Sequence, residues 1–171
     1  QLVSTEDIFK YLQIITAFYV AFAHGSNDVA NAVGPLAAVV SILESGTVQM
    51  KVEMPVWILA MGGGCIVFGL LIWGRRVMMT IGSKITEITP SRGFSAEFGA
   101  ATVVLICSKM GLPISTTHTL VGSVIGVGMA RGLPTLNLGI VYKIFISWIS
   151  TVPFTAILSA VLFKIMLLFL G

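Results

Sequence analysis

The sequence predicts an all-α integral membrane protein that combines transmembrane helices, one of them discontinuous, with a re-entrant helical hairpin. Of its 171 residues, 56% are hydrophobic and only 10% are charged, and the mean hydropathy is +1.00. Several apolar runs approach or exceed the roughly 20 residues that cross a bilayer as helix. Two of these runs are interrupted by small polar residues, which a membrane tolerates only where protein or water surrounds them.

The first element is expected from about residue 5 to residue 43, as a helix that is broken near its middle. Ser4 and Asp7 resemble a capping box, with Asp in place of the preferred Glu, so the helix should begin near Thr5. The apolar stretch 8–43 would be about 54 Å long as uninterrupted helix, against roughly 30 Å of hydrocarbon. A break at residues 25–28 removes this mismatch.

A span over about residues 55–76 follows, with Pro55 in its first turn. Residues 78–89 extend this helix or lie along the membrane surface, and residues 90–93 end it. Five cations share one side of the membrane if the first element crosses once and this span returns, and positive charge favours the cytoplasmic side. They are Lys10, Arg75, Arg76, Lys84 and Arg92.

The re-entrant hairpin is expected over about residues 96–130, because two apolar arms of roughly a dozen residues surround a polar tip and neither spans a membrane alone. A single long broken helix is the alternative. A final span over about residues 136–170 contains Pro153 and is therefore expected to be kinked. The result is a single membrane domain over residues 1–171, with its N-terminal end cytoplasmic and its C-terminal end outside.

Composition excludes several function classes. The net charge is +3, but the Lys and Arg residues are scattered, so no nucleic acid partner is expected. Two Cys and two His residues are too few and too isolated for a metal site. A hydrolase with Ser115 as nucleophile, His118 as base and Asp28 as orienter is disfavoured, because Ser115 stands where a residue caps a helix. We therefore expect no enzyme.

The first polar cluster centres on Asp28, with Asn27 beside it and Asn31 one turn later. A carboxylate at the centre of a membrane helix costs roughly 2.5–3.5 kcal/mol on insertion scales, so it usually has a partner and a function. Carboxylate, amide and backbone oxygens together suit a hard cation such as Na+. The structural alternative is a cap for the helix that follows.

The second cluster, Ser115, Thr116 and Thr117, comes immediately before the second arm of the hairpin. A helix N-terminus carries a partial positive charge and unpaired amides, and hydroxyls add donors, so a tetrahedral oxyanion fits this arrangement. An ordinary N-cap is the alternative. His24 and His118 flank the two clusters; each is either a proton site or, as we favour, a structural hydrogen-bonding residue.

Two segments resemble the signatures of the inorganic phosphate transporter (PiT) family. They are residues 24–35, HGSNDVANAVGP, and residues 111–122, GLPISTTHTLVG; residues 81–86, IGSKIT, add to the likeness. The resemblance implies a symporter of inorganic phosphate and a cation, commonly Na+ and in some bacterial members H+, built from two inverted repeats. It implies that this chain is the C-terminal repeat, one half of an inverted-repeat secondary transporter, and that the N-terminal repeat half is its partner.

The resemblance also implies the site residues. Phosphate would be bound by Ser115, Thr116, Thr117, Asn27 and Asp28, and sodium by Asn27, Asp28, Asn31, Ser115 and Thr116. Na+ is the only metal implied. A phosphate dianion beside Asp28 is repelled unless a cation lies between them, which gives a physical reason for coupled transport.

The alternatives are a proton-coupled phosphate permease and a sulfate permease, since the same donors would satisfy sulfate; a channel is a further rival. The expected location is the cell membrane, plasma or inner, as a multi-pass protein in contact with the lipid bilayer. A homo-oligomer is compatible with the sequence.

Overall fold

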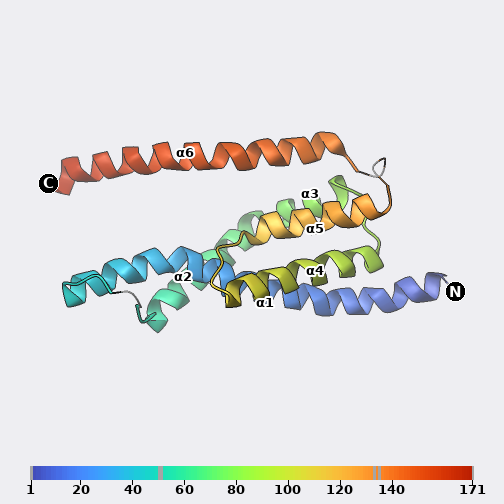
Figure 1. Ribbon diagram of the computed structural model, residues 1–171, viewed down its shortest axis with the longest axis horizontal. Helices are drawn as coiled ribbons and strands as arrows, with labels where there is room; N and C mark the ends of the chain where they lie inside the picture. The colour runs from blue at the N-terminus through green and yellow to red at the C-terminus, as the bar shows by residue number, and fades with distance from the viewer. Residues whose placement is uncertain (1, 50–51, 133, 135, 171) are drawn as a thin grey trace.

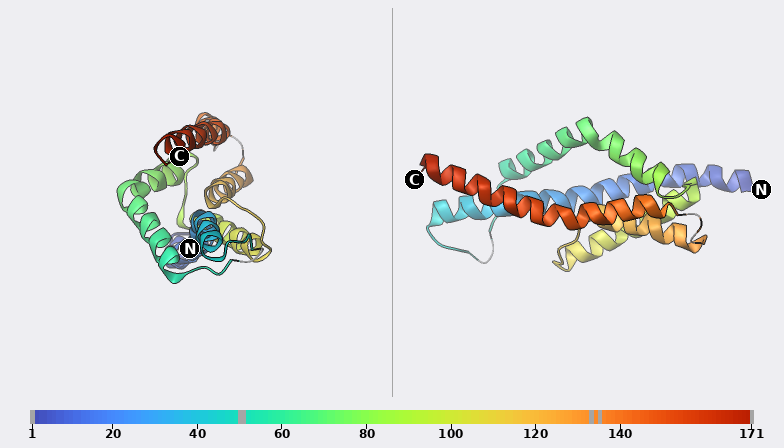
Figure 2. Two further views of the ribbon diagram at one scale, coloured as in Figure 1. Left: turned by 90° about the vertical axis from the view of Figure 1, so that its left-hand side faces the viewer. Right: turned by 90° about the horizontal axis from the view of Figure 1, so that it is seen from above.

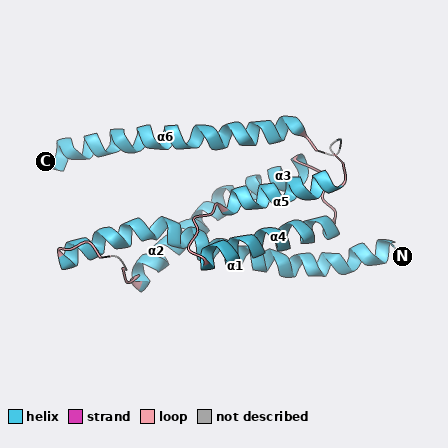
Figure 3. Cartoon of the chain, in the orientation of Figure 1, coloured by secondary structure: helices cyan, strands magenta, loops and turns pink. Residues whose placement is uncertain are grey.

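The molecule is an elongated bundle of helices, and the two ends of the chain lie at opposite ends of its long axis (Figure 1). The computed structural model describes residues 2–49, 52–132, 134 and 136–170, and within these ranges Figure 3 shows helices and loops without strands. The elements are α1 Leu2–Ser45, α2 Val56–Gly69, the π-helical turn η1 Leu70–Gly74, α3 Arg75–Lys84, α4 Pro90–Lys109, α5 Thr116–Ala130 and α6 Leu138–Leu170.

Three segments are long and apolar enough to cross a membrane: Thr5–Ser45, Val56–Lys84 and Leu138–Phe169. The predicted all-α class is therefore confirmed, and the three long apolar helices fit the three predicted crossings.

The predicted break in the first element is wrong, because α1 is continuous through residues 25–28. Its polar side chains pair along the helix: Asn31 Nδ2 donates to Asn27 Oδ1 at 2.9 Å, and His24 Nε2 lies 2.6 Å from Asp28 Oδ2. Residues four apart lie on the same helical face, so these groups are satisfied without unwinding the backbone. At about 66 Å, α1 is longer than the hydrocarbon layer and extends beyond it.

Pro35 lies inside α1, about one turn after Asn31. Proline has no amide hydrogen, so the carbonyl of Asn31 loses the donor that the helix would otherwise supply four residues later. The Asn31 carbonyl therefore lacks its usual helical donor, although α1 continues through Pro35.

The second span consists of α2, η1 and α3 and bends at the π-helical turn, as the view from above in Figure 2 shows. α2 packs on α1 where Val33 and Ile58 are buried. Gly62 is essential to this contact, since a Cβ there would overlap Val33 Cγ1, whereas Gly63 has no neighbour within 4 Å of that position.

The hairpin begins earlier than predicted. Pro90 is the first residue of α4 rather than part of a stop, and proline is well suited to that position. The Glu6 side chain of α1 accepts hydrogen bonds from Ser91 N at 3.0 Å and Ser91 Oγ at 2.7 Å, so an acidic group from another helix stabilises the start of α4. Ser123 Oγ of α5 donates to the Ala96 carbonyl at 2.8 Å and joins the two arms.

The turn between the arms has the geometry of a Schellman motif. Gly111 has a φ of 71°, Leu112 N donates to Cys107 O at 2.9 Å, and Gly111 N donates to Ser108 O at 3.1 Å. The tip of the hairpin lies beside the middle of α1 in Figure 1, and side-chain hydrogen bonds join the two. Both polar segments therefore meet halfway along the molecule.

The last helix, α6, is the least packed. Its first turns contact the cluster around Ile85 and Val121 through Ile140, Ile144 and Trp148, whereas residues 149–169 are exposed throughout. Pro153 lies inside this helix.

Candidate functional site

The candidate site is the place where the hairpin tip meets α1, and its central contact joins Thr116 to Asp28. Thr116 Oγ1, in the first turn of α5, donates to Asp28 Oδ2 at 2.9 Å, and His24 Nε2 lies 2.6 Å from the same oxygen. The side chains of His24 and Asp28 are about one-third exposed, so the carboxylate is held by two partners and still reaches solvent.

Asn27 is the buried member of the site and is only 6% exposed. Its amide contacts Ser108 Oγ at 3.0 Å and Asn31 at 2.9 Å. Turning the amide by 180° lets its nitrogen donate to the Ile114 carbonyl and to Asp28 Oδ1, both at 3.0 Å, while its oxygen accepts from Ser108. In either orientation Asn27 joins the end of α4 to α1.

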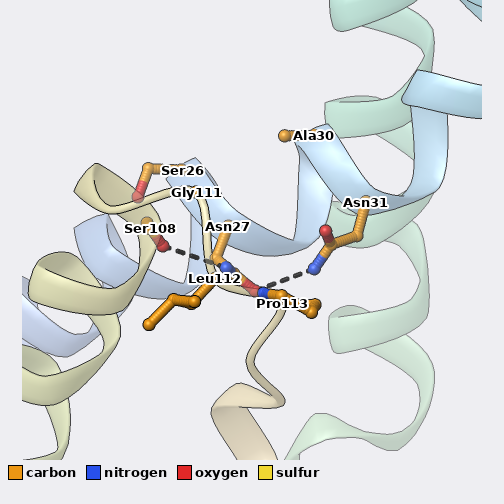
Figure 4. A pocket seen from close by; sticks show the side chains of 8 residues that line it. All are labelled: Ser26, Asn27, Ala30, Asn31, Ser108, Gly111, Leu112 and Pro113. Atoms are coloured by element: carbon orange, nitrogen blue, oxygen red, sulfur yellow. Dashed lines mark hydrogen bonds between the residues drawn. The ribbon is translucent and has the colours of Figure 1, made fainter.

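A cavity of about 280 Å³ opens beside Asn27, and Figure 4 shows the side chains around it. From α1 it is lined by Ser26, Asn27, Ala30 and Asn31, and from the hairpin by Ser108, Gly111, Leu112 and Pro113. Most of the α1 side of this lining is polar. The cavity is therefore formed jointly by α1 and the turn of the hairpin.

The start of α5 presents hydroxyls and amides. Ser115 is the N-cap of this helix, and its Oγ accepts from His118 N at 3.3 Å. The amides of Thr116 and Thr117 belong to the first turn, where a helix provides no acceptor of its own. Ser115 and Thr117 are exposed and Thr116 is half-buried. This helix start can thus donate several hydrogen bonds to one anion.

The structure brings five of the predicted site residues into one hydrogen-bonded or ion-paired group: His24, Asn27, Asp28, Asn31 and Thr116. Ser115 lies next to this group as the cap of α5. Thr117 and His118 are on the same helical turn but have no described hydrogen bond to α1; the His118 ring instead packs edge-on against Trp148, with centroids 3.9 Å apart.

Ser108 was missed by the sequence analysis, although it lines the cavity and hydrogen-bonds to Asn27. The signal was present, since Ser108 and Lys109 already interrupt the apolar arm three residues before Gly111. Among the described residues, no group of three or more His, Cys, Asp or Glu side chains could hold a metal ion. The oxygens that could bind an ion at the site are those of the Asp28 carboxylate and of uncharged groups.

Residues 2–159 match the sequence profile of the Phosphate transporter family. The chain belongs to this family. Within the phosphate transporter family it is 57% identical over 166 residues to a Thermococcus kodakarensis protein assigned as a phosphate permease, covering 97% of this chain and 41% of that relative. It is 48% identical over 158 residues to sodium-dependent phosphate transporter 1 of Pongo abelii, covering 92% of this chain and 23% of the relative.

A solved structure of a sodium-dependent phosphate transporter has the same fold, with a TM-score of 0.86 and 50% sequence identity over 96% of this chain and 41% of that structure. The chain thus spans about two fifths of the length of the first relative and of the solved transporter. Family membership together with three membrane-length helices identifies a multi-pass membrane protein of the phosphate transporter family.

Proposed function

We propose that this chain forms one half of a secondary transporter that moves inorganic phosphate together with Na+. The observation that carries the proposal is the hydrogen bond from Thr116 Oγ1 to Asp28 Oδ2, because it joins the segment suited to a cation to the segment suited to an oxyanion. Family membership and the names of the relatives support the same substrate and ion.

Phosphate is bound at the start of α5 in this proposal. Ser115, Thr116 and Thr117 provide hydroxyls, the first-turn amides add donors, and the helix dipole contributes a partial positive charge. From α1, Asp28 reaches the first turn of α5 through Thr116 Oγ1, and Asn27, with its amide turned, donates to the Ile114 carbonyl just before that turn. Asn27 and Asp28 therefore contact phosphate from the other side, Asp28 through the ion.

Sodium is bound by oxygens of α1 and the α5 start: the side chains of Asn27, Asp28 and Asn31, with the hydroxyls of Ser115 and Thr116. The single negative charge of Asp28 suits a monovalent cation, since neutral oxygens supply the remaining ligands. The Asn31 carbonyl that Pro35 releases is a further oxygen at this position.

Coupling follows from electrostatics. A phosphate dianion and the Asp28 carboxylate repel each other, and at about 4 Å two unit charges interact by roughly 4 kcal/mol near a protein surface. A cation between them converts this repulsion into two attractions. Each ligand therefore improves the site of the other, which is the thermodynamic condition for symport.

Proton coupling is a second candidate, and the His24–Asp28 pair favours it. The pair lies at the centre of the site, with His24 Nε2 2.6 Å from Asp28 Oδ2, and an imidazole beside a carboxylate is a common proton carrier in transport proteins. In this version the protonated pair replaces Na+.

The chain is proposed to be one of two inverted repeats, with its N-terminal end cytoplasmic and its C-terminal end outside. Its termini lie at opposite ends of the molecule, and it covers 41% of the solved transporter. Inverted repeats place substrate at their mutual interface near the bilayer midplane, so the second repeat completes the site. The α4–α5 hairpin, whose tip stops beside the middle of α1, is then re-entrant.

The test is uptake of radiolabelled phosphate into proteoliposomes that contain the protein at its full natural length. We expect accumulation driven by an imposed Na+ gradient. Accumulation driven by a pH gradient alone would assign the coupling to the His24–Asp28 pair. Sulfate accumulation without phosphate accumulation would contradict the substrate, and equilibration without accumulation would indicate a channel.

A further inference from the structure

The last helix, α6, packs on the hairpin along one short face that ends at Trp148. Ile140, Ile144 and Trp148 recur every four residues, so they share a helical face, and all three pack on the cluster around Val121 of α5. From residue 149 to residue 169 the helix is exposed throughout. Trp148 is therefore the last residue of α6 that packs on this cluster, at the point where α6 leaves the hairpin.

The indole ring of Trp148 contacts two other rings. The His118 ring, in the first turn of α5, meets it at 90° with centroids 3.9 Å apart. Phe145, from the preceding turn of α6, meets it at 63° with centroids 4.9 Å apart. Edge-to-face ring pairs of this kind are favourable beyond the area that they bury. Trp148 is thus supported by its own helix and in turn holds His118.

The first turn of α5 is held from two sides. Thr116 and His118 are two positions apart, so their side chains point about 200° apart around the helix. Thr116 Oγ1 donates to Asp28 Oδ2 of α1 at 2.9 Å, whereas the His118 ring meets Trp148 of α6. A hydrogen bond on one side and a ring contact on the other therefore fix this turn between α1 and α6.

His118 is also joined to the cap of α5. Its backbone amide donates to Ser115 Oγ at 3.3 Å, and the first-turn residues Thr116 and Thr117 lie between the two. A displacement of His118 therefore displaces the Ser115 hydroxyl and the amides beside it. Donors that already have the bound geometry bind a ligand more tightly, because less conformational freedom is lost on binding.

We propose that Trp148 is a positioning residue for phosphate binding, which acts through His118 on the first turn of α5. This inference rests on the proposed function, in which that turn and its cap bind phosphate. The described ring contacts of Trp148 are with His118 and Phe145, and it is not one of the residues proposed to bind either ligand. Its removal should therefore lower the affinity for phosphate and leave the maximal rate of uptake unchanged.

The test measures phosphate uptake into proteoliposomes by the protein at its full natural length, over a range of phosphate concentrations and with the ion gradient that drives the wild type. The test variants are Trp148→Leu, His118→Leu and the two combined, and Trp148→Phe retains an aromatic ring. Trp73→Leu is the matched control, because Trp73 also belongs to a membrane-length helix and is 59% exposed.

The apparent KM for phosphate should rise about five-fold in Trp148→Leu and in His118→Leu, since each variant removes one ring pair. The maximal rate should equal that of the wild type, and Trp73→Leu should change neither value. The combined variant should lose no more affinity than either single variant, because both remove the same contact. Trp148→Phe should keep most of the affinity.

A wild type that accumulates phosphate, together with a His118→Leu variant that matches the control, would overturn this inference and leave the proposed function standing. This outcome can be read even if Trp148→Leu does not fold, because the His118 side chain is exposed. Additive losses in the combined variant, or a fall in the maximal rate alone, would also overturn it. A wild type that takes up no phosphate would overturn the proposed function and this inference with it.

Discussion

The polar segment of α1 and the polar segment at the hairpin tip contain similar small residues, yet only the second leaves the helical state. In α1 the side chains pair four residues apart, and Gly25 keeps helical geometry. At the tip, Gly111 adopts a positive φ and Pro113 follows two residues later, so the backbone cannot continue as helix. Small polar residues therefore do not break a membrane helix when they satisfy one another along its face.

The two segments also differ in what they offer a ligand. The α1 segment contributes side-chain oxygens and the carbonyl that Pro35 releases, which suits a cation. The tip contributes the start of α5, whose amides and hydroxyls suit an anion. The contact between Thr116 and Asp28 connects these two halves.

The largest effect is expected from Asp28→Asn, which removes the only charge of the cation half. Apparent Na+ affinity in phosphate uptake should fall on the order of 100-fold, since most of the roughly 4 kcal/mol of ion attraction is lost. Ser115→Ala should alter Na+ dependence less, because Ser115 contributes one uncharged hydroxyl to the ion, whereas Asp28 contributes a full negative charge. Asp7→Asn is the matched control, an exposed carboxylate of α1 that pairs with Lys10. Small, equal effects of Asp28→Asn and Ser115→Ala would contradict the assignment.

A smaller effect is expected from Thr116→Val, which keeps the shape of the side chain and removes its hydrogen bond to Asp28. A hydrogen bond to a charged group contributes about 1.5–3 kcal/mol, so phosphate affinity in the presence of Na+ should fall roughly 10- to 100-fold. Thr119→Val is the control, because the Thr119 hydroxyl bonds to the Ser115 carbonyl within α5. Loss of affinity in both variants alike would mean that the contact with Asp28 has no special role.

The smallest effects are expected on stability, from alanine substitutions at two glycines. Gly111→Ala places a Cβ at a φ of 71° and should lower stability by about 1 kcal/mol. Gly25→Ala should be neutral or stabilising by up to about 1 kcal/mol, since Gly25 is helical and nothing lies within 4 Å of its Cβ position. Thermal unfolding in detergent measures both. If Gly25→Ala is the more destabilising of the two, α1 is not continuous at this position.

Most of the fold could be predicted from apolar length and turn residues. The apolar length of residues 136–170 indicated the last span, and Gly111 with Pro113 indicated the turn of the hairpin. The continuity of α1 could not be predicted, because it depends on side-chain pairs such as His24 with Asp28 and on the hairpin tip that packs against them. Pro90 was read as a stop because sequence alone does not show that Glu6 stabilises a new helix there.

The residues of the candidate site could be predicted from the sequence more completely than the way they are arranged. The sequence analysis selected Asn27, Asp28 and Thr116 by their chemistry. The structure shows a hydrogen bond between Asp28 and Thr116, which are 88 positions apart in the sequence. Ser108 was missed because the interruption of the apolar arm at Ser108 and Lys109 does not by itself show that Asn27 is the partner of Ser108.

The central claim, that the two polar segments form one coupled cation and phosphate site, is tested most directly by phosphate affinity with and without Na+. Isothermal titration calorimetry of the protein at its full natural length gives both values. We predict that Na+ tightens phosphate binding in the wild type and that Asp28→Asn abolishes this gain while retaining weak phosphate binding at the α5 start. Phosphate affinity that is the same with and without Na+ in the wild type would contradict the account.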